Sequence, residues 1–176
     1  MILIGYDGSP DARTAIEHVA TLMPGADATV LAVWKSLDSS LNYHGGLAGR
    51  ASYHGPLGHH PHDDAADWDR ELEEAAAERA AEGAQLATEA GLRATPRVTR
   101  AAASTADAIL VAAEELDASA IVVGSRGLNG GRSWFLGSVS HAALQHADRP
   151  VIAVPSAEVA AKRTTARHEA MTEQAT

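Results

Sequence analysis

Glycine and serine residues recur in one segment of the chain with a spacing that suits the binding of a phosphate group. Gly124 and Gly127 frame a short turn, and Gly137-Ser138 follows after nine further residues. Glycine has no Cβ, so the backbone can bend sharply and approach a ligand closely. Ser138 is expected to begin a helix, whose first N–H groups are unpaired and lie at the positive end of its dipole. These amides, with the hydroxyls of Ser138 and Ser140 as further donors, can hold a phosphate chain.

Charged side chains contribute little to this predicted phosphate site. Arg126 and Arg132 are the nearest cations, and the only lysines of the chain are Lys35 and Lys162. A Walker A loop needs a lysine directly after its last glycine, so this loop is of another kind. Any phosphate here would be held mainly by the main chain.

Histidines cluster in a second segment that invites a metal-binding interpretation. Neutral imidazole binds zinc, copper or nickel. The run His59-His60-Pro61-His62 lacks the spacing that would bring ligands together on one helix face. We therefore predict a solvated, pH-sensitive loop without a dedicated metal site, and keep His54, His59, His60 and His62 as the metal-binding alternative.

Other catalytic arrangements find no support in the sequence. Cysteine is absent, which excludes disulfides, thiolate metal sites and a cysteine nucleophile. The segment 63–91 has ten acidic and two basic residues, but its carboxylates are too uniformly spread for a dedicated acid–base pair. We predict no catalytic residue.

The elements that must position the phosphate loop follow from hydrophobic periodicity. Short apolar runs alternate with helical patterns, and Ser9-Pro10 is a good helix start. This alternation predicts an α/β fold: an open five-stranded parallel sheet with helices on both faces. Ligands of such sheets bind at the carboxyl ends of the strands, where the winding direction reverses. The strands are expected over 2–6, 28–34, 94–100, 120–123 and 151–154, and helices from Pro10 and over 65–90, 105–116 and 138–146.

Length, composition and net charge limit the number of domains and the kinds of partner that the chain can have. Its 176 residues and 45 % hydrophobic content fit one domain over residues 1–155, with a surface loop inserted at 36–62 and a disordered tail at 156–176. The net charge of −9 argues against a nucleic-acid partner. The apolar runs are too short for a signal peptide or a bilayer span, so we expect a cytoplasmic protein without membrane contact.

Four segments, in order, resemble the ATP-binding members of the universal stress protein family. The signature G-x-x-G-x9-G-[S/T] of those members is intact from Gly124 to Ser138. The chain also has the opening Ile-Gly-Tyr-Asp-Gly-Ser, the strand end Ile-Val-Val-Gly-Ser-Arg-Gly, the helix start Leu-Gly-Ser-Val-Ser and the final Arg-Pro-Val-Ile-Ala-Val-Pro. The resemblance covers roughly residues 1–155.

The resemblance implies a nucleotide site and a dimer. Asp7 matches the residue near the ribose and adenine, although it could instead be a turn or capping aspartate. The backbone around Val33 matches the adenine contact. The last strand pairs two subunits in many relatives, which implies a homodimer. The matching positions are Asp7, Val33, Gly124, Arg126, Gly127, Gly137, Ser138, Val139 and Ser140 for the nucleotide, and Val151, Ile152, Ala153 and Val154 for the dimer.

We therefore expect an ATP-binding, Rossmann-like module of the stress response, with Mg²⁺ bridging phosphate oxygens and slow or absent hydrolysis. The alternative is a dimerisation or partner-docking module of the same fold that binds no nucleotide. A pyrophosphatase-type ATP enzyme is disfavoured, because the first loop, Tyr6-Asp7-Gly8-Ser9-Pro10, has one glycine and a proline without an N–H.

Overall fold

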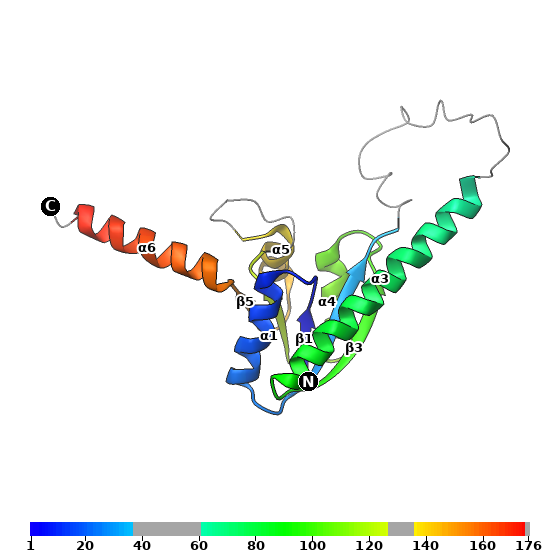
Figure 1. The fold of residues 1–176 in the computed structure, drawn as a ribbon, viewed down its shortest axis with the longest axis horizontal. Coiled ribbons are helices and arrows are strands. Elements are labelled where there is room, and N and C mark those ends of the chain that lie inside the picture. The colour runs from blue at the N-terminus through cyan, green and yellow to red at the C-terminus, as the bar shows by residue number, and fades with distance from the viewer. Residues whose placement is uncertain (37–60, 127–135, 175–176) are drawn as a thin grey trace.

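A five-stranded, all-parallel sheet forms the centre of the molecule and confirms the predicted fold class (Figure 1). The computed structural model describes residues 1–36, 61–126 and 136–174. The strand order is β3-β2-β1-β4-β5, so the chain first builds outward from β1 and then crosses back to β4. The winding direction therefore reverses between β1 and β4. The strands are β1 (Ile2–Gly5), β2 (Asp27–Trp34), β3 (Arg93–Arg100), β4 (Ala120–Gly124) and β5 (Val151–Val154).

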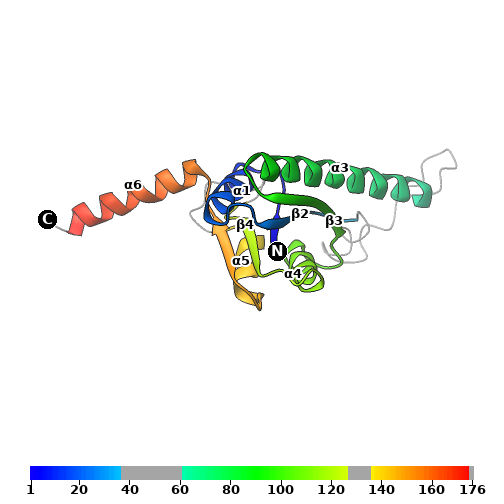
Figure 2. The same cartoon turned by 90° about the horizontal axis from the view of Figure 1, so that it is seen from below.

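Helices cover both faces of the sheet, as Figure 2 shows. Helices α1 and α3 pack on one face, and α4 and α5 pack on the other. The side chains of β1 alternate between the two cores, since Ile4 packs with α1 while Leu3 packs with α4. The helices are α1 (Pro10–Leu22), α3 (Pro61–Glu89), α4 (Thr105–Glu115), α5 (Ser138–His146) and α6 (Ala157–Gln174).

Local sequence signals account for most helix ends. Ser9 caps α1, because its hydroxyl accepts a hydrogen bond from the Ala12 N–H at 3.2 Å, and Pro10 takes the first helical position. Gly91 follows α3 with φ of +98°, a left-handed conformation that glycine adopts without strain. Helix α3 begins at Pro61, so the predicted loop 36–62 is helical at its end. Residues 37–60 lie outside the described part of the chain.

The two edges of the sheet differ in chemistry. Strand β3 carries Pro96 and the arginines Arg93, Arg97 and Arg100. Arg93 and Arg97 form ion pairs with Asp27 and Glu115, and Arg100 stacks over Trp34. Strand β5 at the opposite edge is Val-Ile-Ala-Val, with no charge and no proline.

The C-terminal segment differs from the prediction of a disordered tail over 156–176. Residues 157–174 form helix α6, which projects away from the sheet (Figure 1). The Ser156 hydroxyl accepts from the Val159 N–H, Glu158 pairs with Lys162 one turn on, and alanine is the best helix former. These local preferences support a helix even without an apolar face. Among the described residues, no helix is both long and apolar enough to cross a membrane.

Candidate functional site

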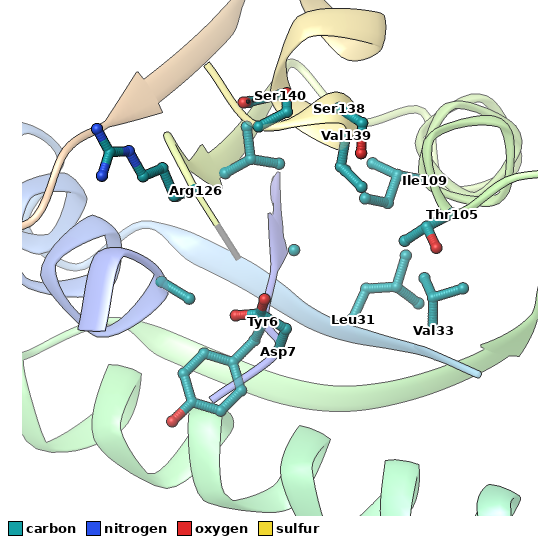
Figure 3. A pocket seen from close by; sticks show the side chains of 15 residues that line it. Tyr6, Asp7, Leu31, Val33, Thr105, Ile109, Arg126, Ser138, Val139 and Ser140 are labelled. Atoms are coloured by element: carbon teal, nitrogen blue, oxygen red, sulfur yellow. Dashed lines mark hydrogen bonds between the residues drawn. The ribbon is translucent and has the colours of Figure 1, made fainter. Parts of the chain in front are cut away.

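A pocket of about 400 Å³ opens at the carboxyl ends of β1, β2 and β4, where the winding direction reverses (Figure 3). Ligands of doubly wound sheets bind at this place, because the loops on either side of the reversal separate. The N-terminal residues of α4 and α5 complete its walls. The lining residues are Gly5, Tyr6, Asp7, Ala12, Leu31, Val33, Thr105, Ile109, Val123, Gly124, Arg126, Gly137, Ser138, Val139 and Ser140.

Two buried serines join the loops that form the pocket. The Ser9 hydroxyl, at the start of α1, lies 3.4 Å from the Arg126 carbonyl oxygen and donates to it. The Ser125 hydroxyl donates to the Asp11 carboxylate at 2.8 Å. Asp11 is only 5 % exposed, so this hydrogen bond satisfies a buried charge. The start of α1 and the loop after β4 are thus held together beside the pocket.

The glycine at the end of β4 is required by packing within the protein. A Cβ on Gly124 would lie 2.8 Å from the Ala12 nitrogen and 2.9 Å from the Asp11 Cβ. These are contacts with the backbone and first side-chain atom of α1, which cannot move aside cheaply. The absence of a Cβ thus lets α1 approach β4; Gly124 also lines the pocket, and its close approach to a ligand stays a prediction.

The N-terminus of α5 presents its first amides to the pocket. Gly137 caps the helix and offers no side chain, so within the described residues no side-chain group occupies these amides. The Gly137 N–H itself donates to the Ser125 carbonyl oxygen at 2.7 Å. The amides of Ser138, Val139 and Ser140 are therefore the donors suited to an anion.

The Ser140 hydroxyl departs from its predicted role as a phosphate donor. It lies 2.9 Å from the Ser125 carbonyl oxygen and 3.0 Å from the Gly137 carbonyl oxygen, and it is 1 % exposed. A hydroxyl has one proton, and these carbonyl groups already accept it. Ser140 therefore fixes the loop to the helix, while Ser138 remains the exposed hydroxyl at the pocket.

One end of the pocket is apolar. Leu31 and Val33 from β2 face Ile109 from α4, and the Thr105 side chain borders the same space (Figure 3). Of these four residues, only Val33 was predicted from the sequence. Thr105 and Ile109 could not be assigned, because α4 follows β3 in the chain and reaches the pocket only through the strand order.

Asp7 and Arg126 supply the charges near the pocket. One Asp7 oxygen accepts a hydrogen bond from the Ser9 N–H at 3.0 Å, which closes an aspartate turn. Figure 3 shows Arg126 on the side of the pocket opposite Thr105, with Asp7 between them. The Arg126 guanidinium points away from Thr105, toward the segment that follows β5. Its positive charge helps to lower the pKa of Glu158, after the larger effects of Lys162.

Tyr6 lines the pocket through its backbone, while its ring points toward α3 (Figure 3). The ring occupies space that only a glycine at position 83 leaves open, since a Cβ there would lie 2.8 Å from it. Burial raises the pKa of Tyr6 to about 12; the nearby Arg13 acts against this shift and Glu82 adds to it. The phenol is thus neutral at physiological pH and belongs to the core.

The structure brings most of the predicted site residues together. Around this single pocket lie Asp7, Val33, Gly124, Arg126, Gly137, Ser138, Val139 and Ser140. Gly127 lies outside the described residues, as do His54, His59, His60 and the side chain of His62. Within the described ranges no cluster of three or more potential metal-ligating side chains occurs.

Comparison with known proteins identifies the family. The model of the universal stress protein family matches residues 50–155. The chain belongs to the universal stress protein family. None of the curated proteins compared with the chain matches it.

Solved structures share the universal stress protein fold with this chain. The hypothetical protein MJ0577 has a TM-score of 0.66 at 18 % identity, with 88 % of this chain and 94 % of that one covered. A universal stress protein in complex with cAMP has a TM-score of 0.55 at 18 % identity, with 89 % and 96 % covered. A family member from Arabidopsis thaliana with AMP bound has a TM-score of 0.56 at 15 % identity, with 88 % and 90 % covered.

Proposed function

We propose that this universal stress protein binds an adenine nucleotide, preferentially ATP with Mg²⁺, in the pocket at the end of β1 and β4. The observation that carries the proposal is the division of one pocket into an apolar end and a helix N-terminus with open amides. An aromatic base fits the first environment, and a phosphate chain fits the second. Two structural neighbours of the same family hold cAMP and AMP, which supports the choice of an adenine nucleotide.

In the proposed complex the base lies between Leu31, Val33 and Ile109. The Asp7 carboxylate is near the ribose, where it can accept hydrogen bonds from sugar hydroxyls. The phosphates lie against the amides of Ser138 and Val139. Mg²⁺, when bound, would neutralise phosphate charge, and Asp7 is the carboxylate among the described lining residues.

We further propose a regulatory role in the stress response of the cytoplasm, with little or no hydrolysis. Hydrolysis needs a group that orients and deprotonates a water molecule. Among the described lining residues the ionisable side chains are Tyr6, Asp7 and Arg126. Tyr6 is held in the core, Asp7 accepts a main-chain hydrogen bond, and Arg126 is a cation. These three side chains therefore favour binding of the nucleotide over its hydrolysis.

Calorimetric titration with ATP, ADP and AMP, with and without Mg²⁺, tests the proposal. Val33→Trp fills the apolar end and should abolish binding, while Val111→Trp on an exposed position of α4 is the matched control and should bind normally. Gly127→Val tests the signature glycine. Absence of nucleotide binding by the wild-type protein, or equal affinities of the Val33 and Val111 variants, contradicts the proposal. Phosphate release above the protein-free rate contradicts the non-hydrolytic role.

A second candidate function is dimerisation through β5, with or without nucleotide. The supporting observation is the uncharged edge strand Val151–Val154, whose first three residues are only partly buried in the single chain. Pairing of two such edges about a two-fold axis would satisfy their free backbone groups. Ile152→Arg should yield a monomer in sedimentation analysis if this edge forms the dimer, and an unchanged mass contradicts it.

A further inference from the structure

Thr105 is a polar side chain at the apolar end of the pocket. Its neighbours there are Leu31, Val33 and Ile109, which offer only hydrocarbon. Asp7 and Arg126 lie farther along the pocket (Figure 3). Among the described residues at this end, Thr105 therefore brings the side-chain hydroxyl, which could reach a bound ring by rotation about the Thr105 Cα–Cβ bond.

The Thr105 hydroxyl is not needed to build helix α4. Ser104 is the N-cap: its hydroxyl accepts from the Asp107 N–H at 3.0 Å and lies 2.6 Å from the Asp107 carboxylate, to which it donates. Thr105 occupies the next position, whose side chain has no part in capping. Thr105 is also half-buried.

We propose that Thr105 is a specificity-determining residue whose hydroxyl forms a hydrogen bond with the polar edge of adenine. This inference rests on the proposed nucleotide site and adds a residue that selects the base. A hydroxyl can both accept from the exocyclic amino group and donate to a ring nitrogen. Since water is largely displaced when the base fills the apolar end, a base edge without this partner would lose a hydrogen bond that it makes in water.

The test combines protein variants with altered ligands in a thermodynamic cycle. Thr105→Val keeps the shape and removes the hydroxyl, whereas Thr105→Ser keeps the hydroxyl. Each protein is titrated with AMP, with purine riboside 5′-monophosphate, which lacks the amino group, and with 7-deaza-AMP, which lacks N7. Thermal unfolding of each variant without ligand serves as the folding control.

We expect Thr105→Val to weaken AMP binding by about fivefold to tenfold, as the loss of one hydrogen bond does, and Thr105→Ser by less than about twofold. At least one analogue should bind the wild type more weakly than AMP does, yet bind Thr105→Val with the same affinity as AMP. The assignment of Thr105 is overturned if Thr105→Val binds AMP with the affinity of the wild type. It is also overturned if each analogue loses as much affinity relative to AMP in Thr105→Val as in the wild type. If the wild type binds AMP but these couplings are absent, only this inference fails; if it binds no nucleotide, the proposed function fails with it.

Discussion

Replacing Ser125 by alanine removes the hydroxyl that donates to the buried Asp11 carboxylate at 2.8 Å. The charge then remains in a site where Asp11 is 5 % exposed, so little water can replace the lost donor. A hydrogen bond to a charged group contributes about 1.5–3 kcal/mol to the free energy of unfolding. For a chain of this size the loss corresponds to a decrease in Tm of roughly 3–12 °C. Urea denaturation monitored by circular dichroism measures the effect directly.

A double-mutant cycle separates this hydrogen bond from other effects of the substitution. In the Asp11→Asn background the charge is gone, and Ser125→Ala should cost only about 1 kcal/mol, the value of a neutral hydrogen bond. Ser119→Ala is the matched control, because the Ser119 hydroxyl donates at a similar distance, 2.9 Å, but to the neutral Met1 carbonyl oxygen and from an exposed position. Its expected cost is below about 0.5 kcal/mol. Equal destabilisation by Ser125→Ala and Ser119→Ala would refute the reasoning about the buried charge.

Three further predictions concern other parts of the fold. Gly124→Ala should lower the free energy of unfolding by about 1–3 kcal/mol because its Cβ would clash with α1, while Gly137→Ala, whose nearest contact is 3.3 Å, should cost less than half as much in the same urea assay. Tyr6 has a pKa of about 12 in the folded protein and about 10 when unfolded, so its contribution to stability is complete below pH 10 and lost as the pH rises to 12. Tyr6→Phe should remove this part of the alkaline destabilisation, and an unchanged pH profile would contradict it. Arg149→Lys should cost about 1–2 kcal/mol, because one guanidinium nitrogen donates to the carbonyl oxygens of both Ala113 and Ala118, at 2.7 and 2.8 Å; equal Tm values for variant and wild type would speak against this brace.

Features governed by neighbouring residues in the chain were predictable from the sequence. The alternation of strands and helices predicted the α/β sheet, and Ser9-Pro10 predicted the start of α1. The α5 start at Ser138 follows from the glycine before it. These signals are local, since they depend on residues within one or two turns of each other.

Features that depend on distant residues were not predictable. Asp11 lies in the first turn of α1, and its hydrogen-bond partner Ser125 is 114 positions away in the chain. Thr105 and Ile109 join the pocket only because β3 returns the chain to the sheet edge beside β2. The glycine spacing was visible in the sequence, yet whether Gly124 makes room for a ligand or for α1 depends on how the two elements pack.

The unlike edges of the sheet limit how many copies of the chain could join by strand addition. At β3, Pro96 lacks an N–H and cannot donate to an added strand, which hinders growth at this edge. At β5 no such protection occurs in the sequence Val-Ile-Ala-Val. If only one edge of the sheet can pair with another copy, that pairing occupies the edge and leaves no free strand for a third copy. Association by this route therefore ends at a closed pair and cannot continue into a fibre.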